Sequence, residues 1–280
     1  METRSPLGGL PDYGRPGFAE QYGASRPHTP SALVDLLCLY ARVERPRLVV
    51  DLGCGTGLST AIWPDRADGV IGIEREPAML ALARQSQTAP NVELRGGVAQ
   101  DTGLPAASAD IVTCVQSFHW MEPEATLREV ARILRPGGVF AAVDYDMPAV
   151  GWEVEVADLR FIETARRLRR EHGLGMLQVK SVDQRKWPKD SHLDSLRGSG
   201  HFCYVREALL HGVEQISAER FLQTALELAG APWGVLEALH ARGVTDEQLG
   251  LTQFRAVADR LVGANGHWFV GYRIRLGIRA

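Results

Sequence analysis

The sequence lacks the features that would tie the chain to nucleic acid, to a metal cluster or to a membrane. Its 31 basic residues do not exceed its 34 acidic ones, and a net charge of −3 gives no general attraction to a polyanion. Four cysteines, Cys38, Cys54, Cys114 and Cys203, show no metal-type spacing, which favours free thiols in a reducing compartment. No apolar run approaches about 18 residues, so we expect no transmembrane helix.

Residues 1–30 also lack a positively charged start followed by an apolar core. We therefore expect no secretory signal, and a cytoplasmic protein. The apolar content of 45% and charged content of 23% are ordinary for a globular protein. A chain of 280 residues can form one large α/β domain, or one domain with an elaborated lid.

A strand followed by closely spaced glycines begins at residue 47. Residues 47–51 are an apolar run that ends in an acid, glycines follow at 53, 55 and 57, and residues 58–63 are suited to a helix. Glycine takes positive φ and lets a ligand approach the backbone. Glu74 closes the next apolar run, 69–73, where an acid can accept hydrogen bonds from ribose hydroxyls. This order predicts the first unit of a nucleotide-binding α/β sheet.

Strands and helices alternate up to residue 146, which predicts a parallel sheet with crossover helices. The expected strands are 47–51, 69–73, 91–94, 110–115 and 139–144, and the expected helices are 32–42, one starting at Pro77, and 123–134. After Pro148 the pattern changes. It predicts a long helix over 153–171, a strand over 201–211, helices near 217–229, 232–242 and 246–262, and a last strand over 267–278, while 173–200 is left unassigned.

The spacing of the glycines points to one nucleotide. A dinucleotide site reads Gly-x-Gly-x-x-Gly. Here an aspartate precedes Gly-x-Gly-x-Gly, which resembles the first motif of the class I, Rossmann-like S-adenosylmethionine (SAM) methyltransferases. The resemblance implies that Glu74 holds the ribose. It implies that the amino-acid part of SAM is held by Asp51, Gly53, Cys54, Gly55 and Gly57.

Residues 97–105 are similar to the family segment that covers the adenine. In the commonest version an aspartate follows the glycine, but Val98 stands there in this chain. The Ala99 backbone, the Gln100 side chain and Asp101 are the alternative contacts. A simple polar loop is the competing interpretation.

Residues 116–120, Gln-Ser-Phe-His-Trp, resemble the segment where the SAM methyl group meets the acceptor, in the version found in trans-aconitate-type and natural-product tailoring methyltransferases. Gln116, Ser117 and Trp120 are expected beside SAM. His119 is a candidate general base, since a pKa near 6.5 suits proton removal. Packing alone is the slightly favoured alternative. Asp144 and Asp146 are alternative bases or turn formers.

Residues 22–27 resemble a family element that folds over SAM. Tyr22 is placed to contact the sulfonium through its ring, and Arg26 to pair with a carboxylate. Arg166, Arg167, Arg169 and Arg170 form a basic cluster on the long helix, read either as an anion site or, preferably, as a solvated face.

We therefore expect a doubly wound, seven-stranded, mostly parallel sheet with a helical lid inserted around its last two strands. Residues 1–30 would be an arm over the cofactor and 31–146 the SAM-binding core. Residues 147–266 would be the lid, with the sixth strand near 201–211, and 267–280 the last strand.

The expected function is transfer of a methyl group from SAM to carbon, oxygen or nitrogen of a small molecule, such as a secondary metabolite. S-adenosylhomocysteine (SAH) would be the product, and no metal, nucleic acid or membrane is expected to take part. Cyclisation or decarboxylation of a natural product on the same fold, and a non-catalytic partner subunit, are the alternatives. An RNA substrate is disfavoured by the acidic balance. A homo-oligomer stays open.

Overall fold

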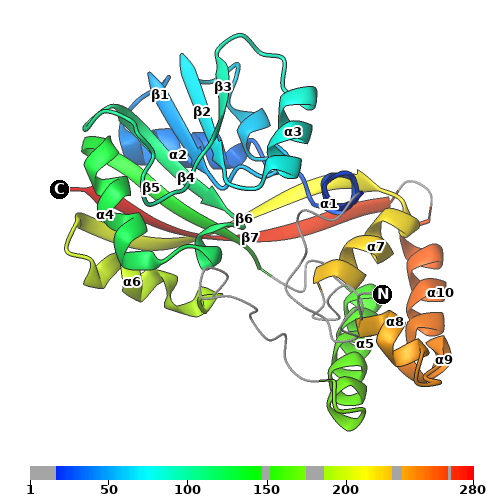
Figure 1. Cartoon of the computed structure of the whole chain (residues 1–280). Helices are drawn as coiled ribbons and strands as arrows, with labels where there is room; N and C mark the ends of the chain where they lie inside the picture. Colours follow the sequence, from blue (N-terminus) through cyan, green and yellow to red (C-terminus); the bar gives the residue numbers. More distant parts are fainter. Residues whose placement is uncertain (1–16, 147–151, 175–185, 229–234, 264–265) are drawn as a thin grey trace, which may run out of the picture.

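A seven-stranded sheet forms the centre of the molecule in the computed structural model, which describes residues 17–146, 152–174, 186–228, 235–263 and 266–280 (Figure 1). The strand order is β3-β2-β1-β4-β5-β7-β6, and only β7 runs antiparallel to its neighbours β5 and β6. The strands are β1 (Leu48–Leu52), β2 (Gly69–Glu74), β3 (Val92–Gly96), β4 (Ala109–Val115), β5 (Leu134–Asp146), β6 (Phe202–Ile216) and β7 (Gly266–Arg279). The predicted fold is confirmed.

Helices cover both faces of this sheet because its central strands carry apolar side chains on both sides. On one face, α2 (Ala32–Ala41) places Leu33 and Leu37 in a core with Val49 and Ile111. On the other face, α4 (Pro123–Ile133) and α6 (His192–Gly198) pack over a second core. The helix α3 (Pro77–Ser86) lies beside β2 and β3. The carboxyl ends of β1, β2 and β4 stay open between these layers.

The predicted helix over 58–63 is wrong, because the segment forms a single turn of 3-10 helix, η1 (Thr60–Ile62). The hydroxyls of Ser59 and Thr60 donate to the Asp51 carboxylate, which fixes this turn to the end of β1. Pro64 follows two residues after the turn ends, and a proline has no N–H to extend the helix. The glycine turn is therefore followed by a short, tethered turn.

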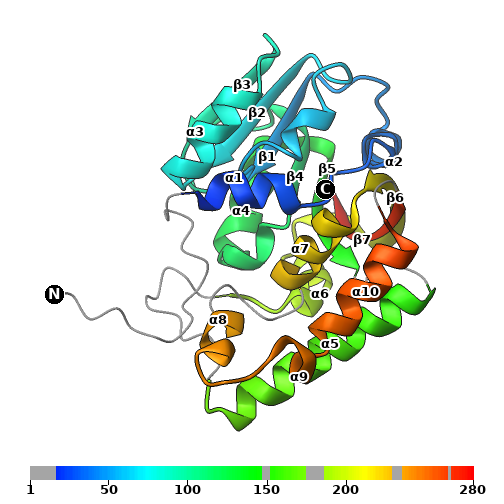
Figure 2. The same cartoon turned by 90° about the vertical axis from the view of Figure 1, so that its right-hand side faces the viewer.

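The C-terminal helices gather where β6 finishes and β7 begins, as Figures 1 and 2 show. They are α5 (Trp152–Glu171), α7 (Ala218–Leu228), α8 (Val235–His240), α9 (Asp246–Leu249) and α10 (Leu251–Leu261). The aromatic contacts Phe161–Phe254 and Phe221–Phe254 join α5, α7 and α10 to one another, and Phe221–Trp268 joins α7 to β7. The helix expected over 246–262 is interrupted at Gly250, whose φ of 77° ends α9 and precedes α10.

The basic cluster on α5 and the N-terminal arm were both singled out in the sequence. On α5, Arg167 pairs with Glu171 one turn away and both side chains are about half exposed, as a solvated face would have them. The first 16 residues of the N-terminal arm lie outside the described residues, whereas residues 18–25 form α1 (Phe18–Ser25). None of the helices in the described part of the chain is both long and apolar enough to cross a membrane.

Candidate functional site

A cavity lies at the carboxyl ends of β1, β2 and β4, where ligands bind in open α/β sheets. Most of its lining comes from five separate stretches of chain. They supply Tyr22 and Arg26; Gly53, Cys54, Gly55 and Thr56; Glu74, Arg75 and Glu76; Val98, Ala99 and Gln100; and Gln116, Ser117, Trp120 and Met121, with Tyr145 beside them. The motifs singled out in the sequence therefore converge on one place.

The glycine turn after β1 requires its glycines. Gly53, Gly55 and Gly57 have φ of 69°, 57° and 88°, in the left-handed region that other residues rarely adopt. The amides of Gly53 and Cys54 donate to the Ile73 carbonyl at 2.7 and 3.1 Å, which fixes the turn against β2. A Cβ on Gly53 would lie 2.6 Å from Ser117 Cβ. The turn is therefore pressed against the segment after β4.

Asp51 lies beneath this turn rather than in the cavity. Its carboxylate is fully buried and accepts hydrogen bonds from Ser59 Oγ at 2.6 Å, Thr60 Oγ1 at 2.8 Å and Thr113 Oγ1 at 3.1 Å. Burial raises the pKa of Asp51, and the three hydroxyls oppose that rise. Among the residues assigned to SAM from the sequence, Asp51, Gly57 and Asp101 are absent from the cavity lining.

Glu74 is held at the end of β2 by backbone amides. Its Oε2 accepts from Gly55 N at 2.9 Å and its Oε1 accepts from Glu76 N at 2.8 Å. The residue is 8% exposed, and burial raises the pKa of its carboxyl against these hydrogen bonds. Each oxygen keeps a further lone pair, so the carboxylate can accept from two neighbouring hydroxyls of a ligand.

The segment after β3 contributes uncharged residues to the cavity lining. Ala99 and Gln100 line the cavity, and Val98, 44% exposed, pairs with Asp101 in an isolated bridge. Asp101 is exposed and is not among the residues that line the cavity.

The N-terminal segment closes the cavity from the side of α7. The Arg26 guanidinium lies 4.4 Å from the centre of the Tyr22 ring. Arg220 donates to the backbone carbonyl oxygens of Ala24, at 3.1 Å, and Arg26, at 2.9 Å, and Thr224 Oγ1 donates to that of Ser25. Two side chains of α7 thus fix the segment that carries Tyr22 and Arg26.

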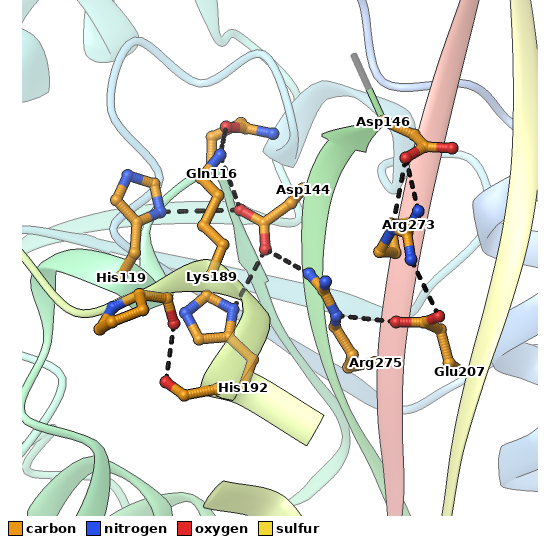
Figure 3. Close-up of polar contacts among 11 residues, drawn as sticks. Gln116, His119, Asp144, Asp146, Lys189, His192, Glu207, Arg273 and Arg275 are labelled. Carbon is orange, nitrogen blue, oxygen red and sulfur yellow. Dashed lines mark hydrogen bonds and ion pairs between the residues drawn. The ribbon is translucent and has the colours of Figure 1, made fainter. Parts of the chain in front are cut away.

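Beside the cavity, Asp144 at the end of β5 gathers four nitrogen-bearing side chains (Figure 3). Its Oδ1 lies 3.0 Å from Lys189 Nζ and 3.6 Å from His119 Nδ1. Its Oδ2 lies 3.1 Å from His192 Nδ1 and 2.9 Å from Arg275 Nη1. We call these five side chains the Asp144 cluster; neither His119 nor Asp144 is among the residues that line the cavity.

Part of the chain is similar in sequence to known methyltransferases, and its fold is similar to one of them. Residues 50–142 match a family model described as a methyltransferase domain. A proposed type II methyltransferase from Anaeromyxobacter dehalogenans superposes with a TM-score of 0.64 at 26% identity, over 90% of this chain and 97% of that one. Residues 50–142 therefore form a class I SAM-dependent methyltransferase domain.

Curated relatives match less than half of the chain. An uncharacterized methyltransferase-like protein of Schizosaccharomyces pombe is 32% identical over 123 residues, 44% of this chain and 47% of that protein. The trans-aconitate 2-methyltransferase of Azoarcus sp. is 39% identical over 121 residues, 40% of this chain and 46% of that enzyme. The chain spans about half the length of the curated relatives that it matches.

Three members of the Asp144 cluster were not predicted from the sequence: Lys189, His192 and Arg275. Lys189 and His192 come from the segment 173–200, which has no clear periodicity. Arg275 was visible in the sequence as a charged residue within a mostly apolar strand. In the structure it pairs in register with Ala142, two residues before Asp144.

The four cysteines are free, and no group of three His, Cys, Asp or Glu side chains suited to a metal ion occurs within the described ranges.

Ionisation in the cluster follows from burial and pairing. Burial lowers the pKa of His119 to about 4, against the opposing interaction with the Asp144 carboxylate 3.6 Å away. For Asp144, burial favours a raised pKa, but its interactions with His119 and His192 and the charge of Lys189 outweigh that effect, and the pKa lies well below its usual range. Near neutral pH the protein therefore holds a neutral His119 against an ionised Asp144.

The shifted pKa of His119 predicts a pH-dependent stability. A histidine in the unfolded chain titrates near 6.5, so the unfolded chain binds about one more proton than the folded chain between about pH 6.5 and about pH 4. The free energy of unfolding should fall as the pH drops through this window, by up to about 1.4 kcal/mol per pH unit. Urea unfolding of the wild type and His119→Gln at a series of pH values measures this, and the variant should show a shallower dependence. Equal slopes would contradict the assignment.

Proposed function

We propose that the chain transfers a methyl group from SAM to a small-molecule acceptor. The observation that carries this proposal is the convergence of the glycine turn, Glu74 and the segments after β3 and β4 on one cavity. Two features of the cavity fit the donor. Thr56 Oγ1 is buried there with no hydrogen-bond partner in the described residues, and the glycine turn keeps its backbone free of side chains. Both leave polar groups for a ligand to meet.

Each part of the lining is assigned one part of the donor. The resemblance implies that the glycine turn meets the amino-acid group, Glu74 the ribose hydroxyls, and Ala99 and Gln100 the adenine. When bound, SAM would supply a sulfonium methyl group, whose carbon bonds to the nucleophile of the acceptor as the S–C bond breaks and its electron pair stays on the sulfur of SAH. The work left to the protein is alignment and exclusion of water.

Aromatic side chains supply the exclusion of water. Tyr22, Trp120 and Tyr145 line the cavity, and burial keeps the pKa of the Tyr145 phenol well above its usual range, so that it stays neutral. Because α7 holds the N-terminal segment through Arg220 and Thr224, we infer that the C-terminal helices act as a lid over the acceptor side.

Support for a small acceptor comes from a relative. The Azoarcus relative is named for a small carboxylic acid, trans-aconitate. His119 and Asp144, expected from the sequence as bases, do not line the cavity, so we assign them as positioning residues that hold the chain after β4 and β5.

Binding of the donor tests the proposal. SAM and SAH should bind one site per chain in calorimetry, and Glu74→Ala should weaken SAH binding about 10- to 100-fold, because two hydrogen bonds to a charged acceptor are lost. Glu93→Ala, which removes an exposed carboxylate on β3, is the control and should leave the affinity unchanged. If neither ligand binds the wild type, the proposed function fails.

A further inference from the structure

We propose that Gln116 is a specificity-determining residue whose side-chain amide donates a hydrogen bond to a carboxylate oxygen of the acceptor. The inference rests on the proposed function, because it assigns the acceptor side of the same cavity. It concerns one side chain at the end of β4 and the lysine that holds it (Figure 3).

Lys189 fixes which way the Gln116 amide faces. Its Nζ lies 2.7 Å from Gln116 Oε1 and 3.0 Å from Asp144 Oδ1. An ammonium group only donates hydrogen bonds, so the amide atom facing it must be the carbonyl oxygen. The amide nitrogen is thereby directed away from Lys189, as Figure 3 shows. The chemistry of the lysine decides this orientation, which an isolated amide would leave open.

The nitrogen so directed has nothing to bind within the described residues. Gln116 Nε2 is buried without a hydrogen-bond partner, and Gln116 lines the cavity. The backbone of Gln116 has a φ of 55°, an unfavourable conformation for a residue with a side chain. Its backbone N–H donates a hydrogen bond to the Val143 carbonyl oxygen at 2.8 Å. Strained residues with unmet donors are typical of ligand sites.

Its place in the sheet puts Gln116 on the acceptor side of the donor. Glu74, assigned to the ribose, follows β2, whereas Gln116 follows β4, two strands further along the sheet. Two strand spacings are about 10 Å. The amide is therefore remote from the ribose position and lies on the side of the Asp144 cluster, to which Lys189 joins it.

Positive charge around this amide favours an anion over a neutral oxygen. Arg26 lines the cavity, and Lys186 Nζ lies 5.2 Å from the centre of the Trp120 ring, which also lines it. Within the described ranges no ion pair joins Lys186 to a carboxylate, while Asp144 is shared between Lys189 and Arg275. A carboxylate accepts a hydrogen bond from an amide, and its negative charge is attracted by both cations. A ketone or an alcohol also accepts a hydrogen bond but carries no charge.

Acetate, the smallest carboxylate, serves as the probe. Isotope-labelled protein loaded with SAH is titrated with sodium acetate, against sodium chloride at equal ionic strength, and the Ser117 backbone amide signal is followed by NMR. We expect a saturable shift with acetate alone. Gln116→Glu keeps an oxygen for Lys189 but replaces the donor with a charge, so acetate affinity should fall at least tenfold while SAH affinity stays within about threefold.

Gln253→Glu on α10 adds the same charge at an exposed site and should change neither affinity. No saturable acetate shift, or an unchanged acetate affinity in Gln116→Glu, would overturn the inference. A large loss of SAH affinity in Gln116→Glu would also overturn it, by assigning the amide to the donor. Failure of the wild type to bind SAH in the loading step would instead remove the proposed function, and the inference with it.

Discussion

Gly53→Ala should reduce the affinity for SAH by at least about 100-fold. A Cβ at this position would lie 2.6 Å from Ser117 Cβ and 3.0 Å from Met121 Cε, and the φ of 69° disfavours any side chain. The backbone must shift to relieve the clash. Any shift displaces the turn and the segment after β4 together, and both line the cavity. Calorimetry with SAH measures the loss, and circular dichroism checks that the variant is folded.

Gly103→Ala is the matched control for this substitution. Gly103 also has a positive φ, 66°, but an added Cβ would meet nothing within 4 Å. It therefore carries a comparable backbone penalty without a steric clash, and SAH affinity should stay close to that of the wild type. A folded Gly53→Ala protein with unchanged affinity would contradict the placement of the donor against this turn.

Asp144→Ala should lower the free energy of unfolding by about 3–5 kcal/mol, the usual cost of breaking a buried ion pair from one side. Asp144 and Arg275 are 4% and 5% exposed, so the loss leaves a buried guanidinium with Glu207 as its remaining ion-pair partner. His192, 1% exposed, loses the acceptor of its Nδ1. Urea unfolding followed by circular dichroism measures the change.

Asp146→Ala is the control. Asp146 lies on β5 two residues after Asp144 and pairs with Arg273 on β7, and both side chains are more than a third exposed. Removing that partly exposed pair should cost about 0–1 kcal/mol. The low pKa of Asp144 adds a dependence on pH with a definite sign. Its contribution is present above the unfolded value near 3.9 and is lost as the pH falls further. Equal losses in the two variants would show that the cluster does not bear on stability.

Several parts of the site could be predicted because their signals are local. The alternation of apolar runs with amphipathic stretches indicated the parallel strands β1 to β5, and the last strand was visible from its parity. Gly53, Gly55 and Glu74 stood out because a turn with positive φ and an acid at a strand end need those residue types. Such requirements act within a few residues of chain.

Other features of the site depend on partners that are distant in sequence. Asp51 was expected beside the ligand, but hydroxyls from Ser59, Thr60 and Thr113 surround its carboxylate. A buried carboxylate is stable only with such partners, and Thr113 is 62 residues away in sequence. The same three groups explain why residues 58–63 form one turn instead of a helix.

By itself the sequence determined the class of sheet, the glycine turn and the acid that follows it, since backbone sterics and the burial of apolar strands act on neighbouring residues. Only the tertiary structure decided what surrounds Asp144 and which way Gln116 faces. Those contacts join residues 48 to 131 positions apart, brought together by the order β4-β5-β7 and by α6 packed below the sheet. A charge buried at a strand end must find its partners there, and no local pattern records which ones it finds.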